Sequence, residues 1–165
     1  MSLEFFFYSV LLVLGAIIQF KNSIQMTKKI YIPIVLLFFI IVRFNNFDVD
    51  FVVYAQYMHG FSIFMYREVA FYFLLTQLYS LVQNEIFTFI IFDFILFYFI
   101  LKIVKNIPNN KSILFIPILM TSFPFIMGLE NVYRQYGAVI FFLYSYTIRV
   151  KSEIKSNMLF MVSIL

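Results

Sequence analysis

Residues 43–68 read RFNNFDVDFVVYAQYMHGFSIFMYRE, and this polar stretch lies between segments that are almost entirely apolar. It holds two arginines, three carboxylates and the only histidine of the chain. Polar groups between hydrophobic segments are costly unless they are wet or paired, so such a cluster predicts a functional site. An ordinary water-exposed loop is the alternative reading, and composition taken alone favours it.

The composition of the surrounding sequence decides the class of protein. Hydrophobic residues make up 64% of the 165 residues and charged residues 12%, about half of the roughly 25% that soluble domains carry. We therefore expect an all-α, polytopic transmembrane helix bundle in contact with the lipid bilayer, with no nucleic-acid partner. The chain lacks cysteine, which excludes disulfides, thiolate metal sites and thiol catalysis. The single histidine cannot form a histidine metal site, and we expect neither metal nor cofactor.

Apolar runs predict the helices that cross or line the membrane. A short helix at about 50–59, capped by Asp48 or Asn46 and ended by Gly60, is expected to lie in the interface. The helix at 69–82 is expected to be tilted or juxtamembrane, whereas 86–101 crosses. The apolar runs cover residues 3–20, 30–42, 69–82, 86–101, 112–127 and 132–148.

The chain shows no internal repeat and no soluble segment, so residues 1–165 are expected to form a single membrane domain. The last apolar run, residues 158–165, is far shorter than the ~20 residues that a spanning helix needs. We therefore expect an N-terminal fragment of a longer protein.

Charge predicts the orientation of the bundle. All lysines lie within residues 21–29, 102–111 and 151–155, and the positive-inside rule places these stretches in the cytoplasm. Residues 43–68 and the turn at 128–131 then lie outside. Three arginines fall on this outer side, against the positive-inside bias. The planar guanidinium of arginine binds phosphate or carboxylate better than the ammonium of lysine does. The three arginines are Arg43, Arg67 and Arg134.

The order of motifs resembles that of a known family. Arg43 precedes Asp50 and Tyr54, Glu68 leads the next apolar helix, and Arg134-Gln135-Tyr136-Gly137-Ala138 opens a later one. This pattern resembles the EpsG family of bacterial exopolysaccharide polymerases, which are similar to Wzy-type O-antigen and capsule polymerases. The likeness covers about the N-terminal half of a typical member. Two positions depart from the family pattern: Val49 precedes Asp50 where glycine is usual, and Val69 follows Glu68 where proline is common.

The resemblance implies a GT-C-like helical architecture, with juxtamembrane helices in the first outer loop, and a glycosyltransferase activity. Such an enzyme joins oligosaccharide repeat units carried on undecaprenyl diphosphate, at the outer face of the bacterial cytoplasmic (inner) membrane. Its partners would be the lipid-linked oligosaccharide and, in addition, export or chain-length proteins.

The residues of the outer side suit this chemistry, and each also has a plainer explanation. A carboxylate can act as general base for the acceptor hydroxyl, and Asp50, Asp48 and Glu68 are the candidates. The same residues can serve as helix caps or interface charges. The candidates for substrate binding, which are helix anchors or interfacial aromatics in the plainer reading, are Arg43, Arg67, Arg134, Gln135, Tyr54 and Tyr57.

Two questions stay open at this point. Asp93 lies within an apolar run, where a charge costs about 2.5–3.5 kcal/mol on insertion scales. It can be protonated, pair with another helix or line a cavity, and we treat it as structural. The alternative function is a transporter, a channel or a flippase for lipid-linked sugars, with Asp93 and Arg134 as pathway residues. A nonfunctional remnant is a third reading.

Overall fold

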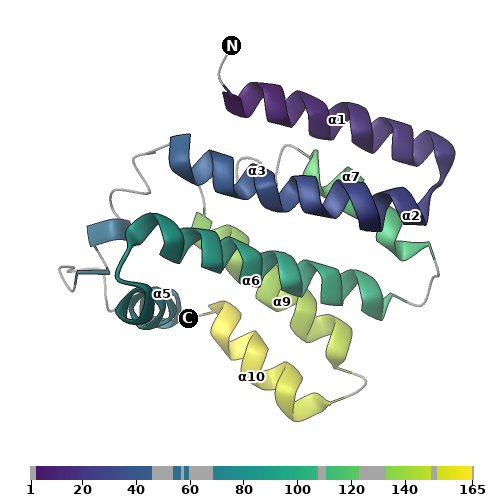
Figure 1. The fold of residues 1–165 in the computed structure, drawn as a ribbon. Helices are drawn as coiled ribbons and strands as arrows, with labels where there is room; N and C mark the ends of the chain where they lie inside the picture. Colours follow the sequence, from purple (N-terminus) through teal and green to yellow (C-terminus); the bar gives the residue numbers. More distant parts are fainter. Residues whose placement is uncertain are drawn as a thin grey trace.

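The computed structural model describes residues 3–45, 54–56, 58–59, 69–107, 111–122, 133–149 and 152–164. Within these residues the chain is helical and contains no strand (Figure 1). The elements are α1 (Leu3–Lys21), α2 (Ile24–Met26), the π-helix η1 (Thr27–Tyr31), α3 (Ile32–Asn45), α5 (Val69–Val82), α6 (Glu85–Asn106), the 3₁₀ turn η3 (Ser112–Leu114), α7 (Phe115–Met120), α9 (Tyr133–Ile148) and α10 (Glu153–Ile164). Residues 54–56 and 58 are helical as well.

The second helical segment is longer than the apolar run at 30–42 that predicted it. It begins after Ser23, whose hydroxyl accepts a hydrogen bond from the backbone N–H of Met26 at 3.3 Å. It then passes through η1, where the N–H of Ile32 bonds the carbonyl of Thr27. Pro33 follows directly and has no N–H to donate. The wider π turn thus carries the helix past the proline without a break.

Two helical stretches within the described residues are long and apolar enough to cross a membrane, Ile24–Phe44 and Glu85–Asn106. Phe5–Lys21 and Phe71–Val82 are apolar but shorter. The expected fold is therefore confirmed as all-helical within the described residues, and the crossing of the membrane by these helices stays a prediction.

The predicted span at 112–127 is wrong as a single helix. Within the described residues this part forms η3 and then α7, which ends at Met120. The backbone N–H and the hydroxyl of Thr121 both bond the carbonyl of Pro117, at 3.1 and 2.7 Å, and close the last turn. Pro124 in the sequence biases the preceding residue away from the helical conformation, which is consistent with this early end.

Contacts between helices give their relative directions. α3 and α6 are antiparallel, because Phe39 meets Phe97 while Phe44 meets Phe87, with ring centroids 5.7 and 6.0 Å apart. α1 and α7 are antiparallel as well: the Tyr8 hydroxyl donates to the carbonyl of Thr121 at 3.3 Å, while Gly15, further along α1, lies beside Pro117.

α6 and α9 run in parallel. Gly137, near the start of α9, lies against Phe92 and Leu96 in the middle of α6, and Tyr144 meets Phe99 further on, at 5.0 Å between ring centroids. α10 then turns back along α9, where the Ser156 hydroxyl bonds the carbonyl of Ser145 at 2.9 Å.

α5 has a direction of its own. It is seen nearly end-on in Figure 1, whereas α1, α3 and α6 run across the page. The corner between α5 and α6 is made by Gln83, in the left-handed conformation at φ 54°, and by Asn84, whose side chain caps α6 by accepting from the N–H of Phe87 at 3.1 Å. This oblique course agrees with the expectation that 69–82 and 86–101 do not cross as one helix.

Candidate functional site

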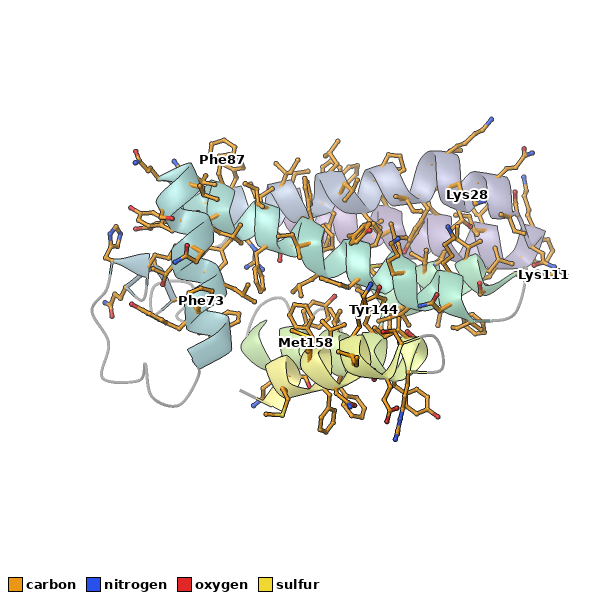
Figure 2. All side chains as sticks on the ribbon, turned by 90° about the horizontal axis from the view of Figure 1, so that it is seen from below. Lys28, Phe73, Phe87, Lys111, Tyr144 and Met158 are labelled. Carbon is orange, nitrogen blue, oxygen red and sulfur yellow. The ribbon has the colours of Figure 1, made fainter. Side chains whose placement is uncertain are left out.

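The helix directions divide the polar residues between two ends of the bundle. Since α3 is antiparallel to α6 and α9 is parallel to it, the end of α3 and the starts of α6 and α9 lie toward the same end of the bundle, which we call the Arg43 end. The opposite end, here the lysine end, carries Lys28 and Lys111 in Figure 2, far from Phe73 and Phe87 at the Arg43 end. The described lysines all belong to helix ends on the lysine side: Lys21, Lys28, Lys29, Lys102, Lys105, Lys111 and Lys155.

A buried ion pair joins α3 to α6 at the Arg43 end. The Nε of Arg43 lies 2.7 Å from Oδ2 of Asp93, and its Nη2 donates to Oδ1 at 3.1 Å. The two residues are 5% and 2% exposed. Such a two-pronged pair is among the stronger hydrogen-bonded arrangements in proteins. Asp93 is thus held by another helix, one of the three explanations left open by the sequence.

Aromatic rings surround this pair. The guanidinium carbon of Arg43 lies 5.5 Å from the centroid of the Phe89 ring, close enough for a cation–π interaction. Tyr136 of α9 is partly buried and interacts electrostatically with both Asp93 and Arg43. The ion pair therefore lies where α3, α6 and α9 meet.

Tyr54 lies beside the same part of the bundle. Its side chain is 6% exposed, and its ring meets Phe71 of α5 edge-on at 5.2 Å between centroids. Phe71 in turn meets Phe92 of α6 at 5.5 Å. The ring of Tyr54 packs inside the protein in this arrangement, and the sugar-stacking role expected of it stays a prediction.

A second polar pair lies nearer the surface. The Nε2 of His59 is 2.7 Å from Oε1 of Glu85, the first residue of α6. The imidazole ring also meets the ring of Tyr79 at 5.0 Å between centroids. His59 is exposed and Glu85 is partly so. The pair connects the polar stretch to the corner between α5 and α6.

The other predicted site residues are placed only in part. Gln135 is exposed in the first turn of α9, and Arg134 belongs to the same turn, with its side chain outside the described part. Among the residues that the structure describes, no group of three or more histidine, aspartate or glutamate side chains could hold a metal ion. The candidates that lie outside the described residues are Asp48, Asp50, Tyr57, Arg67 and Glu68.

Three members of these pairs, Asp93, His59 and Glu85, were not among the site residues predicted from sequence. Asp93 was treated as structural, and its partner could not be chosen because 50 residues separate it from Arg43. Glu85 lies in the short polar break between the apolar runs at 69–82 and 86–101, and no role was predicted for it. A usable signal existed for Asp93 alone, since a carboxylate in an apolar run requires a partner.

Comparisons with known proteins agree with the resemblance seen in the sequence. The model of the EpsG family matches residues 28–165. No curated protein and no solved structure matches the chain.

Proposed function

Because the chain belongs to the EpsG family, we propose that it polymerises a bacterial exopolysaccharide. In this proposal it joins oligosaccharide units carried on undecaprenyl diphosphate at the outer face of the cytoplasmic membrane. The observation that supports this placement is the separation of charge: the described lysines lie at one end of the bundle, and Arg43, His59 and Glu85 lie at the other. The positive-inside rule assigns the lysine end to the cytoplasm.

The proposed reaction transfers a glycosyl group. An acceptor hydroxyl oxygen attacks the anomeric carbon of the donor unit, the bond from that carbon to the diphosphate oxygen breaks, and undecaprenyl diphosphate leaves. The hydroxyl proton passes to a carboxylate acting as general base. We assign this base to Asp50, with Asp48 and Glu68 as the alternatives.

The leaving diphosphate needs cationic partners. We assign it to Arg67 and Arg134, with Gln135, the neighbour of Arg134 in the chain, as an amide donor. Arg134 belongs to the first turn of α9, and the unpaired N–H groups of a helix N-terminus favour anions. The guanidinium of Arg43 already makes two hydrogen bonds to Asp93. We therefore assign Arg43 a positioning role, which is to hold α3 and the start of the polar stretch against α6.

The experiment that tests this function uses a host from which the gene is deleted. The full gene product should restore long-chain polysaccharide, and its Asp50→Asn variant should not, at equal protein level in the membrane. Normal chain length with Asp50→Asn would remove Asp50 from the mechanism. Unchanged polysaccharide in the deleted host itself would refute the function.

A further inference from the structure

An open pocket lies at the corner between α5 and α6, apart from the buried Arg43–Asp93 pair. Its volume is about 270 Å³, and it is lined by Tyr79, Gln83, Asn84, Glu85 and Ile86. His59 stands beside it, bonded to Glu85 at 2.7 Å and in ring contact with Tyr79. The proposed reaction assigns no task to these residues.

The lining combines groups that suit a sugar ring. Tyr79 supplies an aromatic ring, and such rings offer a large apolar face with a polar tip. Gln83 and Asn84 contribute amides, which both donate and accept, and Glu85 contributes carboxylate oxygens that accept from hydroxyl groups. A pyranose presents C–H groups on one face and hydroxyls around its edge, so it can use both kinds of surface at once.

At the corner between α5 and α6, glutamine occupies a left-handed backbone position that usually holds glycine. Gln83 has φ 54°, and glycine is the residue that usually ends a helix in this conformation. Within the described part of the chain, the Gln83 side chain makes no hydrogen bond and is exposed. The turn itself does not need the amide, and Gln83 is one of the residues that line the pocket.

We propose that this pocket binds one sugar ring of the saccharide substrate. Tyr79 packs against the ring, while Glu85 and Gln83 hydrogen-bond its hydroxyls and His59 orients the Glu85 carboxylate. This inference rests on the proposed function for the class of ligand. A volume of about 270 Å³ falls just below the roughly 300–1,000 Å³ of pockets for drug-sized ligands, so the site fits a single ring rather than a whole repeat unit.

A purely structural role for the His59–Glu85 pair makes a different prediction. Exposed ion pairs contribute little to stability, and a pair that only fastened residues 58–59 to α6 would not involve Gln83. Gln83→Gly removes the amide and suits the left-handed backbone, so it tests binding without disturbing the fold.

Binding is measured on the full gene product in lipid nanodiscs, by saturation-transfer NMR with methyl glycosides of glucose, galactose and N-acetylglucosamine as probes. We expect a signal from at least one glycoside, and a severalfold loss of that signal in both Gln83→Gly and Tyr79→Leu. Phe73→Leu is the matched control, because Phe73 is an exposed aromatic on the same helix and should keep the signal. The melting temperature of Gln83→Gly should equal that of the wild type.

The outcomes separate the pocket from the polymerase. Absence of signal from all three glycosides with the wild type, or an unchanged signal in both pocket variants, overturns the inference. If either result accompanies restoration of normal polymer when the wild-type gene is returned to the deleted host, only the pocket is refuted. A glycoside signal that both pocket variants lose, in a protein that restores no polymer, keeps the pocket and refutes the polymerase.

Discussion

Arg43 and Asp93 bind each other through two hydrogen bonds, 2.7 Å from Nε to Oδ2 and 3.1 Å from Nη2 to Oδ1, although 50 residues separate them in the chain. Arg43 stands near the end of α3, as the first residue of the polar stretch, and Asp93 lies in α6, which follows α5. The pair thus fixes α3, which leads into the polar stretch, against α6.

Breaking this pair on one side should destabilise the protein strongly. Asp93→Leu leaves a buried guanidinium without its carboxylate, a change worth about 3–5 kcal/mol. Arg43→Met should cost a similar amount, whereas the double variant should lose much less than the sum of the two. Thermal unfolding of the four proteins in one detergent measures this coupling. Lys105→Met, at an exposed position, is the control. Losses that simply add would contradict the pairing.

Overpacking between α6 and α9 should also destabilise the fold. A Cβ on Gly137 would lie 3.8 Å from Cδ2 of Leu96, which is ordinary contact distance, so Gly137→Ala should be tolerated. Gly137→Leu has no room and should cost about 1–3 kcal/mol. Val139→Leu, on an exposed position of the same helix, should be neutral. Equal melting temperatures for the leucine and alanine variants at Gly137 would argue against the close α6–α9 contact.

Cysteine labelling should show that the Arg43 end and the lysine end of the bundle lie on opposite sides of the membrane. The native chain contains no cysteine, so single-cysteine variants report cleanly. We predict that Ser62→Cys and Asn131→Cys react with an impermeant maleimide added outside cells, and that Asn109→Cys reacts only after permeabilisation. Labelling of Asn109→Cys in intact cells would reverse the assignment of the lysine end.

Arg134 and Arg149 should respond differently to lysine. Bidentate hydrogen bonding to a diphosphate requires the planar guanidinium, for which lysine is a poor substitute. Arg134→Lys should therefore strongly reduce the amount of polymer. Arg149 is exposed at the lysine end of α9, and Arg149→Lys should leave polymer unchanged. The readout is polysaccharide yield at matched protein level. Wild-type yield from Arg134→Lys would identify Arg134 as an interface anchor.

Helices were predictable from the sequence where an apolar run ends at a strong signal. The runs at 3–20, 69–82 and 132–148 correspond closely to α1, α5 and α9. The runs at 30–42 and 86–101 gave helices that were too short, because the flanking lysines continue a helix as readily as apolar residues do. Composition marks the limit of the apolar segment, whereas capping marks the limit of the helix.

The candidate site was less predictable because it depends on contacts distant in the chain. The sequence indicated that Asp93 needed a partner, but several cations could have filled that place. The contact between His59 and Glu85 depends on the corner at Gln83 and Asn84, and no local sequence pattern predicts this contact. Parallel α6 and α9 bring Tyr136 to the same point, and that arrangement is set by packing across the whole bundle.

The most direct test of the proposed function supplies the purified full gene product, in lipid, with its undecaprenyl-diphosphate-linked repeat unit and no nucleotide sugar. A ladder of longer lipid-linked chains should form with the wild type and be absent with Asp50→Asn. Movement of unextended units between leaflets without any ladder would contradict the proposal and identify a flippase instead.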